Sequence, residues 1–534
     1  MQYEENTVYP PGTVPLIQFQ EATSTRKGVA LFPQPSDDPN EPLNWPKWRK
    51  VVNMALIFGM TMAAFTMLMV QTVFWQQMVI DLDVDTTDLT NAQSAQLAGL
   101  AVGCLFFIPL TVKYGRRLTY LVSIAAMAAS SWWMAYMHTK TELIVSSILA
   151  GLSGAINETA VQMTIADLFF VHQRGAAVAV YFVAVNFGSF LTPLAAGTQA
   201  AVQGWRSSYT ALSISLTVLF VAYIFCYEET KYIPISTGRC VVDANEQNSI
   251  RGEDKLRVTD DERKAIDTLR KTDSAAYMAP VMNTYHQRMR LLTPTGESLW
   301  KIFILPLGTI ILPHVLFTAI QFAAGVAWLV ILMTATSIVF SAPPYSFNTA
   351  GVGYMTLGPF VGNVLGNICG GPVSDWLVIR AARRQGRLFE PEMRLYPLII
   401  PVLSISGGLI MFGTTAARGM HWIFPSIGGA VFGFGLGAMG EITFTLVVDT
   451  YLELTAEAFV GIAFLRNAIN IGIPSALVPW LTAMGLSNMY ILAGCIALAV
   501  GLLHVPLIIW GKRIRIVLAP RYQSLVAKKQ PAQL

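Results

Sequence analysis

The sequence predicts an all-α membrane protein that consists of two pseudo-symmetric bundles of six helices. Of its 534 residues, 54% are hydrophobic and only 13% are charged, whereas soluble domains carry about 25% charged residues. One membrane-spanning helix needs about 20 apolar residues, so the chain has room for a dozen. The apolar segments occur as six, a polar stretch and six more, and features of the first six recur in the second.

The first six predicted helices follow a polar N-terminal segment, residues 1–49. This segment has no apolar run of signal-peptide length after a basic start, so the first helix is expected to be an uncleaved anchor. Gly103 and Pro109 mark the end of the second helix. The six helices are expected at about 51–74, 92–112, 118–136, 143–167, 175–201 and 208–227.

The second six helices follow a polar stretch from Glu228 to about Trp300, whose mixed charges are typical of a solvated connector. Gly366 and Pro372 mark the end of the eighth helix with the spacing that Gly103 and Pro109 have in the second. The six helices are expected at about 310–338, 348–371, 396–414, 421–447, 458–484 and 488–511. The expected units are an N-terminal tail (1–49), a bundle (50–228), a linker loop (229–301), a second bundle (302–511) and a C-terminal tail (512–534).

The lysines and arginines set the expected orientation. With the N-terminus inside, the outer loops hold only Lys140, Arg206 and Arg418, and Arg466 falls within a helix. All other lysines and arginines then lie on the cytoplasmic side, as the positive-inside rule requires. We expect a multi-pass protein of the plasma membrane with both termini in the cytoplasm.

The first outer loop is acidic instead. It holds four aspartates, which are Asp81, Asp83, Asp85 and Asp88. A solvated loop is the favoured interpretation, and a vestibule that concentrates cations is the alternative.

The two halves repeat each other at an intramembrane acid. Glu158 follows a glycine by four residues in the fourth helix, as Glu441 does in the tenth. Each helix then carries an aspartate near its inner end, Asp167 and Asp449. Membrane proteins with repeated halves are often carriers with a site between the repeats.

Basic turns follow the second and eighth helices, and such turns can contact acidic groups of neighbouring helices and latch one conformation. Positive-inside topology alone is the alternative explanation. The expected gating residues are Gly115, Arg116, Arg117, Asp167, Arg174, Asp375 and Asp449.

Six short motifs are specific when they are taken together. They are Asp38–Trp45, Gly115-Arg116-Arg117, Ile165–Phe170 with Arg174, Gly204–Arg206, Glu229–Lys231 and Gly371–Asp375. With them, residues 36–515 resemble the major facilitator superfamily. Within it, the chain is similar to the fungal twelve-helix group related to drug:proton antiporters and to a yeast cation and polyamine carrier. The resemblance implies transport by alternating access.

Two positions depart from the pattern of that family. Val112 stands where the family has an acid before its glycine-arginine-arginine turn, so the gating latch is expected to be asymmetric. Ser147 stands where drug antiporters usually have an arginine that the family associates with proton transfer. The fifth helix keeps Gly188, Pro193 and Gly197 of the antiporter motif, which the family links to export; tight packing is the alternative role.

Glu158 is the expected proton-coupling residue, because a carboxylate in the membrane should face a cavity or a partner. A group whose proton affinity rises with burial and falls beside a cation can exchange a proton for a cationic substrate. Glu441 and Arg466 fall at similar depth, so we expect them to form an ion pair that leaves Glu158 as the freer carboxylate. A structural role for each acid is the alternative.

Polar and aromatic side chains of several helices could line the substrate cavity, with interhelical hydrogen bonding as the alternative role for the amides. These residues are Gln71, Trp75, Gln162, Asn186, Gln321, Trp328, Asn363, Asn367, Asn467 and Asn470.

The sequence predicts no cofactor, no metal site and no enzymatic activity, because no Walker-type, metal-ligand or catalytic pattern is recognisable. A net charge of +4 argues against nucleic-acid binding. The expected partners are a small-molecule substrate, protons and the lipid bilayer, and we expect a monomer. The predicted function is proton-coupled efflux of a drug, toxin or specialised metabolite. The alternative is proton-coupled uptake of an organic cation or polyamine; a nutrient sensor and a membrane enzyme are less favoured.

Overall fold

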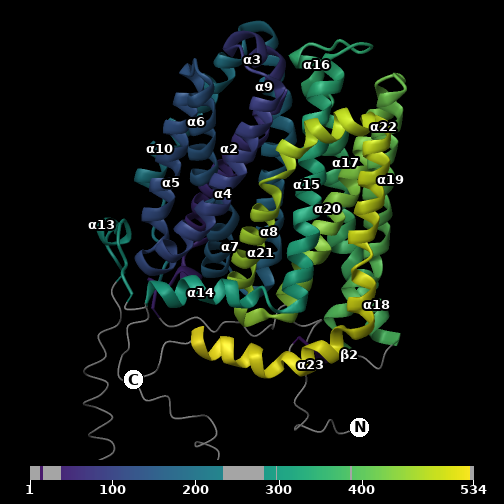
Figure 1. Cartoon of the computed structure of the whole chain (residues 1–534). Helices are drawn as coiled ribbons and strands as arrows, with labels where there is room; N and C mark the ends of the chain where they lie inside the picture. Colours follow the sequence, from purple (N-terminus) through teal and green to yellow (C-terminus); the bar gives the residue numbers. More distant parts are fainter. Residues whose placement is uncertain (1–11, 16–37, 233–281, 296–297, 385–387, 530–534) are drawn as a thin grey trace, which may run out of the picture.

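The computed structural model describes residues 12–15, 38–232, 282–295, 298–384 and 388–529 (Figure 1). Almost all of them are helical, apart from a short antiparallel pair of strands, β1 (Val14–Pro15) and β2 (Leu388–Phe389). We call the end of the molecule that carries Arg117 and Arg394 the basic end. The opposite end, which carries Asp81 and Asp88, is the acidic end.

The first half of the chain forms six crossings, two of which are broken into shorter helices. A helix of about 20 residues spans 30 Å, and the first crossing has 27. The helices are α2 (Lys47–Val73), the short α3 (Trp75–Leu82), α4 (Thr86–Tyr114), α5 (Arg116–Tyr136), α6 (Lys140–Gly154) with α7 (Ile156–Leu168), α8 (Val171–Asn186) with the π-helical turn η2 (Phe187–Leu191) and α9 (Thr192–Gln203), and α10 (Trp205–Cys226).

The second half is more interrupted. Short 3₁₀ helices, η1 (Pro42–Asn44), η4 (Pro391–Leu398) and η5 (Leu452–Leu454), precede crossings in the two halves. The helices are α13 (Tyr285–Arg288), α14 (Leu299–Thr309), α15 (Pro313–Ser341), α16 (Thr349–Tyr354) and α17 (Leu357–Ile368) with the π-helical turn η3 (Cys369–Val373), α18 (Ser374–Arg384), α19 (Ile399–Ala417), α20 (Ile423–Thr450), α21 (Thr455–Asn470), α22 (Ile473–Gly501) and α23 (His504–Lys529).

Ten helical segments in the described part of the chain are long and apolar enough to cross a membrane. One of them, Leu452–Lys529, has 78 residues and is interrupted at Gly485, whose backbone (φ 73°) separates two helices. It therefore holds more than one crossing. The eighth predicted crossing is absent from the ten because it is divided between α16, α17 and η3. The predicted all-α fold with two six-helix bundles is confirmed.

The repeat extends to helix packing. In the first half α4 packs against α6, as α17 packs against α20 in the second. A Cβ added to Gly103 would lie 2.6 Å from the Ala155 Cβ, and one added to Gly366 would lie 2.9 Å from the Ala438 nitrogen. Neither position has room for a side chain, so the glycines allow the backbones to approach closely.

Two regions differ from the expected helix pattern. The apolar stretch that begins near Ile302 forms two helices, because Pro313 starts a new helix after the break that follows α14. At the other end of the chain, α23 continues helically through residues 512–529 of the expected tail. Both α14 and α23 lie across the basic end, at the bottom of the view in Figure 1.

Candidate functional site

A central cavity lies between the two halves. Its walls come from α2, α4, α7, α8 and η2 of the first half and from α15, α17, α20 and α21 of the second. The cavity has about 1390 Å³ of space free of atoms. Seven aromatic rings line it, those of Phe65, Tyr181, Phe182, Phe190, Phe322, Phe444 and Phe459.

An ion pair joins the halves in the wall of this cavity. Glu158 on α7 pairs with Arg466 on α21, and the two side chains are only 5% and 14% exposed. Asn467 donates a hydrogen bond to Oε2 of Glu158 (2.6 Å) and accepts one from Nε of Arg466 (3.2 Å). Because each charge is neutralised by a group of the opposite half, the pair can sense the relative position of the halves.

The expected pairing of Arg466 with Glu441 is therefore wrong. In the structure α21 packs against α4 and α7 of the first half, which brings Arg466 to Glu158. Glu441 lies beside the turn η3, where a Cβ added to Gly370 would be 3.0 Å from the Glu441 Cβ. The freer carboxylate of the two is Glu441, and the one in the cavity is Glu158.

Half of the other expected cavity residues line the cavity. These are Gln162, Asn186, Asn363, Asn367 and Asn467.

The remaining five expected residues, Gln71, Trp75, Gln321, Trp328 and Asn470, are not among its lining residues. Gln321 instead donates to the Val500 carbonyl (2.8 Å), and Asn470 donates to the Ala323 carbonyl (3.1 Å) within the second half. Trp75 begins α3, the short helix beyond the first crossing, and Gln71 and Trp328 are buried in the helix core.

Sequence reasoning missed two glutamines of the second crossing that line the cavity, Gln93 and Gln96. Gln96 donates to the Met67 carbonyl (3.1 Å), and Gln93 accepts from Thr334 of the other half (3.1 Å). The sequence feature that could have identified them is a pair of amide side chains three residues apart in an apolar helix, a spacing that places both on one face.

Hydrogen bonds join the halves on the acidic side of the cavity. The hydroxyl oxygens of Ser94 and Ser475 are 2.6 Å apart, and Thr356 donates to the Phe190 carbonyl (2.9 Å). Gly197 of the antiporter motif also faces the other half, because a Cβ there would lie 2.9 Å from the Thr349 oxygen. The two halves are thus closed together toward the acidic end.

The other two antiporter-motif residues lie within the first half. Gly188 is in the π-helical turn η2 and faces α2, where a Cβ would lie 2.9 Å from the Phe65 Cβ. Pro193 follows this turn at the start of α9. Bulges of this kind are frequent at functional sites, and both η2 and η3 lie beside the cavity walls.

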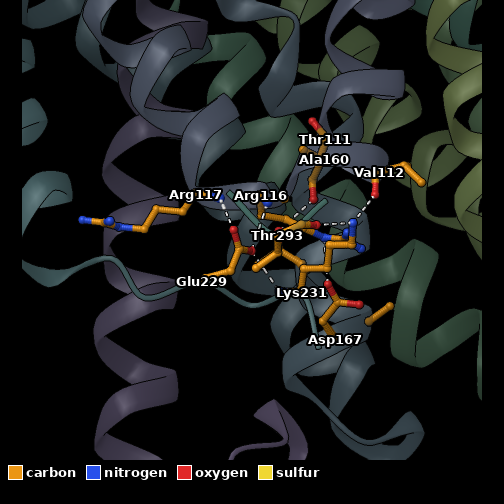
Figure 2. A network of polar contacts seen from close by, with 12 residues as sticks. Thr111, Val112, Arg116, Arg117, Ala160, Asp167, Glu229, Lys231 and Thr293 are labelled. Atoms are coloured by element: carbon orange, nitrogen blue, oxygen red, sulfur yellow. Dashed lines mark hydrogen bonds and ion pairs between the residues drawn. The ribbon is translucent and has the colours of Figure 1, made fainter. Parts of the chain in front are cut away.

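The basic turn of the first half forms a polar network (Figure 2). Arg116 pairs with Asp167 (Nε to Oδ2, 2.9 Å), so two expected gating residues are in contact. Arg174 instead donates to the carbonyls of Ala166 (2.9 Å) and Phe169 (3.1 Å) at the end of α7. Burial lowers the pKa of the Arg174 guanidinium from its ordinary value, while nearby Asp167 opposes this effect.

Glu229 provides the acid at the turn where Val112 departs from the family pattern. Its carboxylate accepts hydrogen bonds from the backbone N–H groups of Arg116 (3.0 Å) and Arg117 (3.1 Å). Gly115 has a positive φ of 112°, and a Cβ there would collide with this carboxylate. Figure 2 shows Lys231 beside Glu229, and its ammonium donates to the Val112 carbonyl (2.7 Å).

The second half has its own cluster at the basic end. Arg394 lies between Asp375 (Nη1 to Oδ1, 2.6 Å) and Asp449, and it contacts both carboxylates. Sequence reasoning named both acids and missed Arg394. Its signal was an arginine just before the ninth crossing, on the side where Asp375 and Asp449 were expected.

The comparisons with known proteins agree with this architecture. The sequence model of the Major Facilitator Superfamily matches residues 56–473. An uncharacterized MFS-type transporter of Schizosaccharomyces pombe is 29% identical over 97% of this chain and 94% of its own length. The major facilitator superfamily multidrug transporter FLU1 of Candida albicans is 26% identical over 91% of this chain and 75% of its own length.

A solved structure has a similar fold. The proton:xylose symporter XylE bound to 6-bromo-6-deoxy-D-glucose superposes with a TM-score of 0.54 at 16% identity, over 86% of this chain and 95% of that one. At this identity the similarity concerns the fold alone.

Proposed function

The chain belongs to the major facilitator superfamily, and from this premise we propose that it exports a small organic molecule in exchange for protons by alternating access. The family consists of transporters and not of enzymes. The observation that carries the proposal is the ion pair of Glu158 and Arg466, which lies in the wall of the cavity and joins the two halves.

The coupling depends on competition at Glu158. A proton on the carboxylate removes its charge and weakens its attraction to Arg466. A substrate that binds the carboxylate displaces both the proton and the arginine. A ligand shifts a conformational equilibrium only if it binds the two conformations with unequal affinity. Because the proton and the substrate cannot occupy Glu158 together, they bind it in opposite steps of the transport cycle.

The cavity lining favours an organic and partly aromatic cargo. Seven rings provide stacking surfaces, while Gln162, Asn186 and Asn363 provide amides that fix orientation. Such a lining of apolar walls with few polar groups is typical of small-molecule sites. A drug, toxin or specialised metabolite has this chemistry, and the name of the multidrug transporter FLU1 is consistent with such a cargo.

The proposal places the basic end in the cytoplasm and the protein, as a monomer, in the plasma membrane. The lysines and arginines of the basic turns support this orientation. Arg116 with Asp167 and Arg394 with Asp375 and Asp449 then act as latches at the cytoplasmic end.

Ethidium, a planar organic cation, tests the proposal in proteoliposomes. With an imposed pH gradient, the wild-type chain should concentrate ethidium against its own gradient. The variant Glu158→Gln/Arg466→Gln, which removes both charges of the pair together, should lose this pH-driven accumulation. Accumulation by the double variant at the wild-type rate would show that the pair does not couple transport to protons.

Uptake of an organic cation is the second candidate, because the cavity contains a carboxylate. The acidic end supports it less than expected, since Asp81 pairs with Arg206 and Asp88 pairs with Lys140. Accumulation of labelled spermidine by cells that express the chain, with no ethidium efflux, would favour this candidate.

A further inference from the structure

The last helix, α23, contacts the rest of the protein through one stripe of side chains. Residues at spacings of three and four lie on one face of a helix, and here they are Leu507, Gly511, Arg515, Leu518, Tyr522, Leu525 and Lys529. Arg515 pairs with Glu392 (2.7 Å), and Lys529 pairs with Glu457 (3.0 Å). Leu525 is buried against the second half. We call this face the inner stripe.

A face of α23 that flanks the inner stripe is exposed along its length. This outer stripe consists of Trp510, Arg513, Val517, Arg521, Ser524 and Lys528. Trp510 is 53% exposed and Val517 is 74% exposed. A helix that presents tryptophan, valine and three cations together is typical of a membrane interface, where the ring sits among headgroups and the cations face phosphates.

The cations of the two stripes differ in their partners. Arg515 and Lys529 of the inner stripe are paired with acids, and neighbouring Lys512 pairs with Glu390 (2.5 Å). Within the described ranges, no acid pairs with the side chains of Arg513, Arg521 or Lys528. These exposed side chains are therefore available to anions that approach from outside the protein.

We propose that the outer stripe of α23 binds the headgroups of anionic lipids. The helix lies across the basic end of the bundles (Figure 1), and the headgroup region of a bilayer begins where the apolar crossings end. Arginine donates paired hydrogen bonds to phosphate oxygens, and basic segments beside a membrane are attracted to its anionic leaflet. The exposed apolar side chains Trp510 and Val517 make the same face suited to the acyl boundary.

The position of α23 connects this surface to the end of the second half that carries the Arg394 cluster. The inner stripe contacts Glu392 through Arg515, and Glu392 lies two residues before Arg394. Headgroups that hold the outer stripe therefore restrain the segment that positions Arg394 between Asp375 and Asp449.

Native mass spectrometry of the purified full chain tests the proposal without any transport substrate. Phosphatidylserine and phosphatidylcholine are added separately at equal concentrations. The wild-type chain should retain phosphatidylserine preferentially, and Arg513→Gln/Arg521→Gln/Lys528→Gln should lose that preference. Each removed cation should weaken lipid binding by about fivefold, which corresponds to ~1 kcal/mol. Higher salt should reduce the wild-type preference.

A charge-preserving variant separates charge from folding. Arg513→Lys/Arg521→Lys should keep most of the preference, and all variants should unfold at the wild-type temperature because these side chains are exposed. Equal retention of phosphatidylserine by the triple glutamine variant would overturn the proposal. So would a wild-type preference that appears only after deletion of residues 242–263, since that acidic segment would then be the partner.

Discussion

Glu158 and Arg466 determine the chemistry of the cavity at the scale of single residues. Each is a charge in an apolar helix and, among the described residues, its ion-pair partner belongs to the other half of the molecule. Removing one member of a buried ion pair leaves the other charge uncompensated, whereas removing both avoids that cost. The pair therefore has two roles. It is a structural contact between the halves, and it is a switch that depends on the protonation of Glu158.

We predict that Glu158→Gln and Arg466→Gln each lower the free energy of unfolding by about 3–5 kcal/mol. The double variant should recover most of this loss, because no buried charge remains unpaired. Thermal unfolding of the purified proteins measures the four states of this double-mutant cycle. Losses in the two single variants that simply add in the double variant would contradict the ion pair.

Glu229 carries a second prediction, because its carboxylate accepts two backbone N–H groups at the basic turn. Glu229→Gln should lower the free energy of unfolding by about 1–3 kcal/mol, since a charged acceptor is replaced by a neutral one. Val112→Asp should restore part of this loss by supplying the acid that the family has there. Asp83→Asn is the control, an exposed left-handed residue for which asparagine is suited.

The residues of the site were predictable by type, but their partners were not. An acid in each repeat and an arginine in the eleventh helix are visible in the sequence. Which acid meets Arg466 depends on the direction in which α21 faces, and helical depth alone does not give that direction. For the same reason Asn470 was expected in the cavity, whereas its side chain bonds to the Ala323 carbonyl of α15.

At the scale of elements, the broken crossings determine how closely the halves approach. Hydrophobic runs predicted the crossings and their order, because apolar length is the strongest signal that a bilayer imposes. The π-helical turns η2 and η3 were not predicted, since they depend on neighbouring helices and not on composition. α14 was not predicted as a separate helix, since the seventh helix was expected at about 310–338 and the apolar stretch before it carries no clear helix signal of its own.

Gly197 gives a prediction at this scale. Its substitution by leucine should prevent closure at the acidic end, because the added side chain would occupy the space of the Thr349 backbone oxygen. A cysteine at position 94, introduced as Ser94→Cys, should then react faster with a membrane-impermeant maleimide. Gly407→Leu is the matched control, a helical glycine with open space around its Cβ position. Unchanged reactivity in Gly197→Leu would contradict a closing role for this contact.

At the scale of the whole molecule, two halves share one cavity and are joined by hydrogen bonds on its acidic side. The pattern of six apolar segments, a polar stretch and six more, together with the repeated acids, predicted two halves with a site between them. The closed end could not be predicted, because it results from side-chain contacts between helices far apart in the sequence. Ser94 and Ser475 are 381 residues apart and yet in contact.

Alternating access is tested most directly by a reversible lock between these two serines. The variant Ser94→Cys/Ser475→Cys, in a chain whose exposed Cys226 and Cys495 are replaced by serine, should form a disulfide on oxidation. Ser131→Cys/Ser213→Cys is the matched control, because those hydroxyls are 2.9 Å apart within the first half. Ethidium transport in proteoliposomes should stop in the oxidised lock, return on reduction, and continue in the oxidised control. Transport at an unchanged rate by fully cross-linked Ser94→Cys/Ser475→Cys protein would contradict the account.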